Sequence, residues 1–534
     1  MSAILTDQFR ILRASDFIAS IGNTSNSYYT FLSVPDINEI DSDWENNIPD
    51  PIDSFDEENR AFDNIVALSK IAPSDARQVV RKYTWVTGET YEMYRNDYSR
   101  VNRTPITNST RLYDSKFYVL TSDYRVYICL QNGTDPDNPK GRPSINEPTH
   151  TTTTAQAAGD GSDKYLWKYL YTIRPNDVIK FDSTDFIPVP EKWSLGNPEV
   201  SDIVDAAVDG SIEAAVIVNA GIGYGSATSI NNIPIIGDGE GAEASIAISS
   251  EGKVVDISIT NRGSGYSYGT LDISNVTHTG IGTTTLANFD IIISPKGGHG
   301  ANIYRELGAN RVLLYSRFEN LQFQNPDVIS SNSFARLGVV KNPETFSGTG
   351  VTFTQPTASG LYALKLTGVG ASTLSFVDDE RITQTVGSGM TAVGRVASYD
   401  KTTQILKFWQ DRSLVLSQPE GGPSSPAYGT QPQFGYKLLR FTGSVGTGGN
   451  LTINQPDNPS PNGLSIDNTF GTSNNPSSTT TINNRKYNLG QAFVNGVANP
   501  EIKPRSGDII YVDNREPIPR SRNQKEDIKI IIEF

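Results

Sequence analysis

Residues Gly507–Phe534 read GDIIYVDNREPIPRSRNQKEDIKIIIEF and contain two apolar runs separated by turn-forming residues. Asn514, Pro517 and Pro519 interrupt the first run, and the second, Ile528–Phe534, largely alternates isoleucine with other residues. Alternation with a period of two, bounded by proline and asparagine, predicts two strands. Because a chain end stays ordered only when sheet or core contacts hold it, we expect these strands to pair with strands from much earlier in the chain.

The residue order of this stretch (Gly-Asp, two apolar residues, Tyr, Asn-Arg, Pro and a final apolar strand) resembles the C-terminus of a baseplate wedge protein of T-even-type contractile-tailed bacteriophages. Three further blocks agree with the resemblance and occur in the family's order. They are Ser20-Ile21-Gly22 at the end of an opening helix-like segment, Gly159-Asp160-Gly161 followed by Tyr165–Leu170 and Pro188-Val189-Pro190, and Ser333–Val340 followed by Asn342-Pro343. Together these blocks cover about half of the chain.

The resemblance implies a structural subunit that scaffolds the wedge and takes part in the baseplate rearrangement that triggers sheath contraction. It implies a homodimer that contacts other wedge proteins of the same phage. The expected location is the virion, in the tail baseplate, after assembly in the host cytoplasm. The rival class is a host-recognition protein, either a fibre-like adhesin or a polysaccharide-degrading tailspike, because 59 acidic residues leave room for paired carboxylates.

The composition restricts the chemistry that the chain can perform. The 534 residues carry 59 acidic against 45 basic side chains, a net charge of −14, which argues against a nucleic-acid partner. Cys129 is the single cysteine and the three histidines are far apart, so internal disulfides, CxxC metal sites and HExxH motifs are excluded. No apolar run has the length of a secretion signal or membrane span. We therefore expect no enzymatic activity, cofactor, metal or small-molecule substrate.

The segment Asp36–Asn59 contains ten acidic residues and no lysine or arginine. The simpler interpretation is a solvated loop. The functional interpretation is an acidic arm on which Trp44, Ile48 and Phe55 dock against a basic neighbouring subunit, because aromatic residues are enriched in interface cores and opposite charges steer partners together.

The first two hundred residues mix helices and strands. Helical spacing and a possible Thr6 cap predict a helix over 6–21, and similar arguments predict a helix over 60–72 and a second, capped by Ser74, as far as Val80. Two paired strands are expected within Lys116–Leu130. The turn-rich loop 135–141 resembles a calcium loop but lacks its spaced ligands. The aromatic row in 165–173 could stack sugars or bases, although core packing is the commoner use of such a row.

A glycine-rich repeat occupies the next part of the chain. Val216–Gly225 and Ile257–Ser267 share a short strand followed by Asn-x-Gly-x-Gly-Tyr, which predicts a turn with glycines at positive φ and a packed tyrosine. Nucleotide binding is the alternative, but neither copy has the third glycine of the dinucleotide fingerprint. Beyond the repeat, His299 lies in a glycine loop, where a hydrogen-bonded structural role competes with that of a ligand or base.

The fold is expected to be mainly β (α+β), with a discontinuous β-sandwich framework, a few N-terminal helices and two inserted small β domains. Short strand-like runs between 361 and 409 predict a small barrel or sandwich, and the Gly/Asn/Ser/Pro-rich stretch after it predicts a linker or surface loop that need not bury anything. The expected segments are framework 1–200, β-repeat insertion 201–300, framework 301–345, β insertion 346–445, linker or loop 446–485 and framework strands 486–534.

Overall fold

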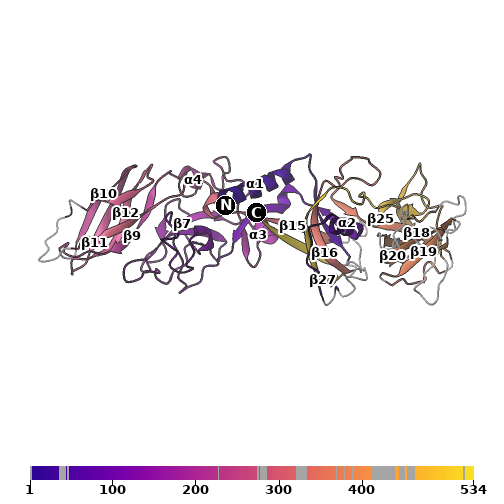
Figure 1. Ribbon diagram of the computed structural model, residues 1–534, viewed down its shortest axis with the longest axis horizontal. Coiled ribbons are helices and arrows are strands. Elements are labelled where there is room, and N and C mark those ends of the chain that lie inside the picture. The colour runs from indigo at the N-terminus through magenta and orange to yellow at the C-terminus, as the bar shows by residue number, and fades with distance from the viewer. Residues whose placement is uncertain are drawn as a thin grey trace. The chain divides into compact units, whose positions relative to one another are not determined.

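The computed structural model describes residues 3–34, 44, 47–225, 228–273, 276, 285–319, 333–368, 370–377, 379–387, 390–410, 439–443, 452–453, 464–520 and 524–534. The chain forms two compact units (Figure 1). Unit 1 contains Met1–Ile18, Ala76–Leu314 and Ile530–Phe534, and unit 2 contains Ala19–Asp75 and Tyr315–Lys529. Each unit combines segments that are distant in sequence, and the finer division expected from the sequence stays a prediction.

The prediction of a mainly β fold is confirmed, because antiparallel strands form most of both units. Unit 1 begins with α1 (Asp7–Gly22), where Thr6 Oγ1 accepts a hydrogen bond from the Phe9 backbone N–H at 3.3 Å. This confirms the opening helix and its cap. Near the other end of the chain, Phe534 packs on α1, with its ring centroid 5.6 Å from that of Phe17.

An aromatic core fills the centre of unit 1. Its principal sheet has the order β4 (Tyr118–Leu120), β5 (Arg125–Asn132), β7 (Tyr165–Thr172) and β6 (Gln156–Ala157). The rings of Tyr165 and Trp167 stack with centroids 5.2 Å apart, and Trp167 is fully buried. The aromatic row is therefore core packing rather than a surface for sugars or bases. In the turn-rich loop 135–141, the Asp135 carboxylate accepts hydrogen bonds from Arg142 and Asn138.

Further elements of unit 1 surround this core. A second sheet joins β8 (Phe186–Pro188), β3 (Ala76–Arg81), β15 (Arg311–Glu319) and β28 (Lys525–Glu533), and β15 and β28 continue into unit 2. The shorter helical elements are η2 (Leu112–Asp114), α3 (Pro175–Phe181), α4 (Ser201–Asp205) and α5 (Ile303–Glu306). In the part of the chain that the structure describes, no helix is long and apolar enough to cross a membrane.

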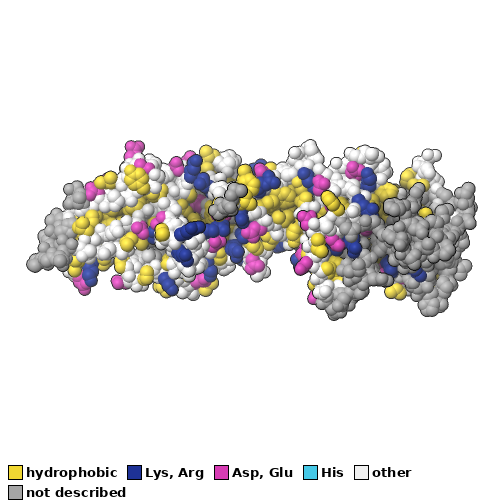
Figure 2. Space-filling view, in the orientation of Figure 1, with side chains coloured by type: hydrophobic (Ala, Val, Ile, Leu, Met, Phe, Trp, Pro, Cys, Tyr) yellow, Lys and Arg dark blue, Asp and Glu magenta, His cyan; other side chains and the backbone are white. Residues whose placement is uncertain are grey.

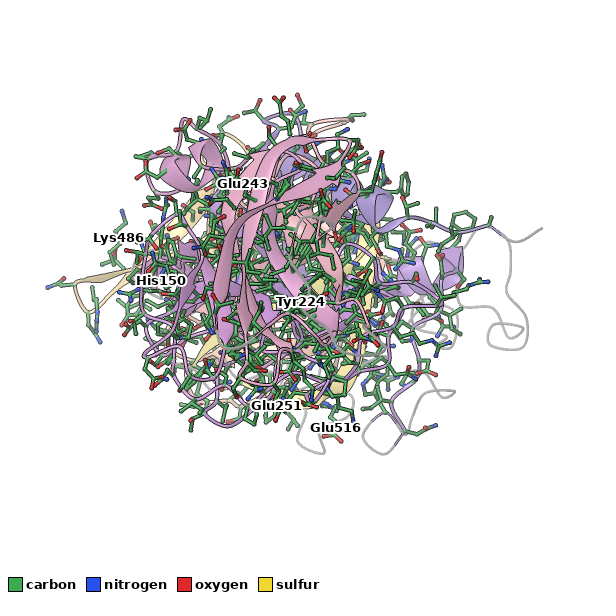
Figure 3. The ribbon with its side chains drawn as sticks, turned by 90° about the vertical axis from the view of Figure 1, so that its left-hand side faces the viewer. His150, Tyr224, Glu243, Glu251, Lys486 and Glu516 are labelled. Carbon is green, nitrogen blue, oxygen red and sulfur yellow. The ribbon has the colours of Figure 1, made fainter. Side chains whose placement is uncertain are left out.

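The glycine-rich repeat forms a small two-sheet module in unit 1. One sheet pairs β9 (Ile212–Asn219) with β14 (Asn288–Ile293), and the other has the order β12 (Val254–Ser264), β11 (Glu240–Ile248), β10 (Ser229–Gly237) and β13 (Gly269–Leu271). The two sheets share one apolar core, whereas Ala214, Val216 and Ile292 of β9 and β14 face the aromatic core instead. In Figure 3, Tyr224 lies among these strands and Glu251 lies in the turn between β11 and β12.

Both copies of the repeat adopt the predicted turn. The Asn219 side chain accepts a hydrogen bond from the Gly221 N–H at 2.9 Å, and Asn261 accepts one from Gly263 at 3.2 Å. The two glycines have φ of 61° and 57°. Such backbone angles suit glycine because it has no Cβ to clash with the preceding peptide.

The tyrosine of each copy anchors its turn inside the module. Tyr224 and Tyr266 are 3% and 4% exposed. The Tyr224 hydroxyl accepts from the Ala287 N–H at 2.6 Å, and the Tyr266 hydroxyl donates to the Ile235 carbonyl at 3.1 Å. The predicted packing role of these tyrosines is confirmed, and their hydroxyls satisfy buried backbone groups as well.

Unit 2 contains a five-stranded sheet with the order β17 (Thr357–Ser359), β2 (Ile65–Lys70), β1 (Tyr28–Ser33), β16 (Ser333–Lys341) and β27 (Asp508–Pro519). In Figure 1, β16 and β27 lie side by side, with α2 (Phe55–Asp63) next to them. Phe62 of α2 belongs to the core on this sheet, against which Ile509 and Val512 of β27 pack. The expectation that the C-terminal strands pair with strands from much earlier in the chain is confirmed for β27.

The predicted helices over 60–72 and 74–80 are wrong. Helix α2 ends at Asp63, β2 follows at once, and the 3₁₀ turn η1 (Pro73–Asp75) leads into β3. Five of the six residues of β2 are buried, so its apolar side chains face cores on both sides. A strand that is buried on both faces has a continuous apolar run, which helical spacing can imitate over a few residues.

The predicted strands between 361 and 409 are confirmed, and they form a curved sheet in unit 2. Its order is β19 (Arg381–Gly387), β20 (Met390–Asp400), β21 (Ile405–Trp409), β18 (Tyr362–Thr367), β23 (Leu464–Ile466) and β22 (Thr452–Ile453), with β26 (Val497–Ala498) also on β18. The end strands β19 and β22 contact each other, so the sheet curls towards a barrel.

The linker or loop expected over 446–485 was not expected to bury apolar side chains. Among the residues that the structure describes, this expectation is wrong. Ile453, Leu464 and Ile466 are at most 1% exposed and belong to the core of the curved sheet. Further along, β24 (Ser477–Ile482) forms a hairpin with β25 (Arg485–Phe493). The polar composition of the whole stretch hides these strands, because two or three apolar residues are enough to fix a short strand in a core.

Candidate functional site

The acidic segment of unit 2 is anchored beside β27 by a tryptophan. The Trp44 side chain is 4% exposed, and its Nε1 donates a hydrogen bond to the Arg515 carbonyl at 2.8 Å. The guanidinium of Arg336, on β16, lies 5.3 Å from the centroid of the indole ring. The ring predicted to contact a partner is therefore buried within its own unit, where a cation–π contact and a backbone hydrogen bond hold it.

A second contact holds the same segment close to the strand. The Asn514 side-chain amide donates to the Pro49 carbonyl at 2.9 Å. Residues 48–53 have no regular secondary structure, and Ser54 then caps α2 by accepting a hydrogen bond from the Glu57 N–H at 3.3 Å. The acidic segment thus reaches helix α2 alongside β27. Its residues 49–54 have no regular secondary structure and are mostly exposed, as the loop interpretation expects, but that interpretation is wrong from Phe55 onward, where α2 begins.

A groove of about 380 Å³ lies between this segment and β27. Its strand side is formed by Ile509, Ile510, Tyr511 and Val512, four consecutive residues. Successive side chains of a strand point to opposite faces of the sheet. A groove that touches four in a row therefore runs along the edge of the strand rather than over one face.

The opposite wall of the groove is acidic. Asp53, Glu57 and Glu58 line it, together with a single basic residue, Arg336. Glu57 Oε2 lies 3.9 Å from Arg336 Nη2 and Glu57 Oε1 lies 3.8 Å from Arg60 Nε. Within the described residues, the carboxylates of Asp53 and Glu58 have no ion-pair partner. The groove therefore carries negative charge that its own walls do not neutralise.

Strand β27 is the last strand in its sheet, with β16 on one side. The register shifts between Val339 and Val340, which leaves Ile510 without a residue opposite it. This bulge exposes the Ile510 side chain to 41% at the groove. The backbone groups of β27 that point away from β16 have no strand beside them in the part of the chain that the structure describes.

The three residues predicted as partner contacts have different surroundings. Trp44 is buried, whereas Ile48 is 38% and Phe55 is 87% exposed. A partner contact of Ile48 or Phe55 stays a prediction. Sequence reasoning missed the groove residues of β27, although Pro517 and Pro519 gave a signal, because proline within a strand is typical of a sheet edge.

Figure 2 shows acidic, basic and apolar side chains interspersed over the described part of one face of the molecule. On that face, charge is distributed locally rather than in one extended area of a single sign. Any electrostatic preference for a partner there must come from local groups of charges, such as the carboxylates of a groove.

Unit 1 contains a buried ionic network. Lys168 Nζ lies 3.0 Å from Glu213 Oε1, with side chains 1% and 10% exposed. Burial by itself would raise the pKa of Glu213, but the attraction of Lys168, its hydrogen bond to the carboxylate and the smaller electrostatic effects of His299 and Arg262 together leave this pKa below its ordinary value of 4.5.

His299 belongs to the same network. Its Nδ1 lies 2.6 Å from Glu306 Oε1, and both side chains are at most 2% exposed. The other Glu306 oxygen accepts from the Gly300 N–H at 2.7 Å, and the Tyr94 ring stands edge-on to the imidazole with centroids 4.6 Å apart. These contacts confirm the structural interpretation of His299, since the imidazole and the carboxylate hold the glycine loop inside the core.

Across the described ranges, no group of three or more His, Cys, Asp or Glu side chains is placed to hold a metal ion. No family model matches the chain, and no curated protein matches it. The groove beside β27 is the candidate site that combines an end strand of a sheet with carboxylates that lack an ion-pair partner among the described residues.

Proposed function

We propose that the chain is a structural subunit of the baseplate wedge of a contractile-tailed bacteriophage. In this role it scaffolds wedge assembly and takes part in the baseplate rearrangement that triggers sheath contraction. The proposal includes a homodimer and contacts with other wedge proteins of the same phage, in the virion tail baseplate, after assembly in the host cytoplasm. It assigns the chain no catalytic role.

One observation carries the proposal. Two of the blocks that resemble the wedge family, 333–340 and 507–519, are separated by residues 341–506, yet they pair as strands β16 and β27. A third block, Ser20-Ile21-Gly22, adjoins the same sheet, because Ser20 Oγ lies 2.7 Å from the hydroxyl of Tyr28 on β1. The family-like blocks of unit 2 thus form one framework, which supports a shared fold rather than chance matches.

The groove supports the structural part of the proposal. A scaffold subunit needs surfaces that recognise neighbours, and an open strand edge beside unneutralised carboxylates is such a surface. The acidic segment, whose functional interpretation is an arm that docks a basic neighbour, supplies the carboxylates of this groove, so a basic partner is proposed here too.

The test is the solution molar mass of the purified chain by light scattering after gel filtration, alone and mixed with the other wedge proteins of the same phage. The proposal predicts two copies alone and a larger complex in the mixture. A trimer that forms no complex with the wedge proteins and hydrolyses a host polysaccharide would instead support the tailspike alternative.

A further inference from the structure

We propose that the groove beside β27 binds an extended segment of a partner protein in which lysine or arginine alternates with apolar residues, and that this segment adds to the sheet as a strand. The inference deepens the proposed function, on which it rests for the source of the partner. It names the chemistry of the segment and the way in which it is held.

The first argument is that β27 is an edge strand of its sheet. Antiparallel strands alternate between backbone groups that face one neighbour and groups that face the other. Strand β27 has β16 on one side, and its last position in the sheet leaves the outward N–H and C=O groups without a strand partner among the described residues. An extended peptide can accept and donate hydrogen bonds along such an edge, as in recognition by strand addition.

The second argument is that the chain's own neighbouring segment is unsuited to this pairing. Pro49 and Pro51 lie in it, and proline has no N–H to donate. The segment is instead attached through side chains, by Asn514 to the Pro49 carbonyl and by Trp44 to the Arg515 carbonyl. It forms a wall at a distance from the strand and leaves a groove rather than a sixth strand.

The third argument is the size of the groove. The five residues of β27 that line it lie between Ile509 and Asn514, a span that corresponds to about 20 Å of extended chain at roughly 3.4 Å per residue. The volume of about 380 Å³ falls in the range of pockets that hold specific ligands, roughly 300–1,000 Å³. A short stretch of extended backbone with its side chains fits these dimensions.

The fourth argument is the chemistry of the two walls. A bound strand would direct alternate side chains to opposite sides. Ile510, 41% exposed, and Ile52, 66% exposed, offer apolar contact. The carboxylates of Asp53 and Glu58 offer ion pairs to basic side chains and repel acidic ones. Alternation of basic and apolar residues gives a bound strand one face of each kind, which suits a groove lined by both apolar side chains and carboxylates.

The experiment measures fluorescence anisotropy of a labelled octapeptide that alternates lysine with valine, titrated with the full-length chain. We expect saturable binding with a Kd below about 1 mM. The same peptide with glutamate in place of lysine should bind at least about tenfold more weakly. A version of the peptide that is N-methylated at alternate backbone nitrogens should also bind about tenfold more weakly, because it cannot donate all of the backbone hydrogen bonds to β27.

The matched variants locate the binding. The double variant Asp53→Lys, Glu58→Lys should weaken binding of the lysine–valine peptide by about tenfold or more. Glu251→Lys, an exposed acidic residue of unit 1 at 71% side-chain exposure, should leave it unchanged. Circular dichroism should show the same fold for all three proteins, since the substituted side chains are on the surface.

No saturable binding, equal binding of the N-methylated peptide, or equal binding by the double variant would overturn the inference. Failure here is distinguishable from failure of the proposed function. If the chain assembles with wedge proteins but does not bind the peptide as described, the strand-addition inference alone is refuted. If it binds the peptide as described but assembles with no wedge protein, the proposed function alone is refuted.

Discussion

The indole Nε1 of Trp44 donates a hydrogen bond at 2.8 Å to the carbonyl oxygen of Arg515, a residue 471 positions further along the chain. This bond attaches the acidic N-terminal segment to the C-terminal strand β27. It places the wall of carboxylates opposite the strand edge, and so it defines the groove that we propose as a docking surface.

Trp44→Ala should destabilise unit 2. Removal of a buried tryptophan costs about 3–5 kcal/mol, because apolar contacts are lost and a cavity remains. The unfolding free energy, measured by urea denaturation with far-UV circular dichroism, should fall by that amount. Ile48→Ala, at a residue 38% exposed in the same segment, should change it by less than about 0.5 kcal/mol. Equal effects of the two substitutions would show that Trp44 is not an anchor.

Gly338→Ala should disturb the pairing of β16 with β27. A Cβ at this position would meet the Tyr511 carbonyl oxygen and the ring of Phe31. Relief of such a clash requires backbone movement, at a cost of about 1–3 kcal/mol. Gly22→Ala is the matched control, since a Cβ there would meet nothing within 4 Å. Urea denaturation should separate the two variants, and a Gly338→Ala protein as stable as the control would contradict the register described for these strands.

Lys168→Met should leave the carboxylate of Glu213 buried without its nearest cation. Breaking one side of a buried pair costs about 3–5 kcal/mol. The exposed pair Lys253–Glu251 offers a control, because Lys253→Met removes a surface ion pair worth about 0–1 kcal/mol. Thermal denaturation at pH 7 should show a large loss of stability for Lys168→Met and a negligible loss for Lys253→Met.

The same pair predicts a pH dependence of stability. Because the folded protein lowers the pKa of Glu213, its carboxylate stabilises the fold at pH values above its ordinary pKa of 4.5. This contribution is lost as the pH falls through the lower pKa of the folded state. The unfolding free energy should therefore decrease on acidification below about pH 4.5. Glu213→Gln should flatten the dependence of the unfolding free energy on pH in this range. An unchanged dependence would show that Glu213 does not cause it.

Asp238 should titrate at about pH 2. Its carboxylate accepts hydrogen bonds from the Ser267 hydroxyl and from the Ser267 N–H, the latter at 2.8 Å, and these bonds lower its pKa from 3.8 to about 2. Carboxyl ¹³C chemical shifts of aspartate-labelled protein would measure this value. Ser267→Ala removes the hydroxyl donor and should raise the pKa towards 3.8, while an Asp238 that titrates near 3.8 in the unaltered protein would contradict the turn geometry.

Much of the fold followed from local patterns in the sequence. Period-two alternation predicted β27, the strands around Lys116–Leu130 and those between 361 and 409, and the Asn-x-Gly-x-Gly-Tyr repeat predicted its turns. These predictions succeeded because each depends on residues that are neighbours in the chain. The error at 60–72 arose where a strand is buried on both faces, since such a strand has no alternation to reveal it.

The site was harder to predict, because its two walls come from opposite ends of the chain. The acidic wall could be recognised from composition, and Trp44 was singled out, but as a surface contact. Its burial depends on Arg336 and Arg515, whose proximity no local pattern encodes. The open edge of β27 depends on the strand order of the whole sheet, of which Pro517 and Pro519 gave the single local indication.

Under the proposed function the chain belongs to a contractile-tailed phage, and the most direct test is to locate it in the tail of that phage by cryo-electron microscopy of intact particles. The account predicts density for both units within the baseplate, with two copies in each wedge and an extended segment of a neighbouring protein along β27. Particles in which the chain forms a distal trimeric fibre or spike, or from which it is absent, would contradict it.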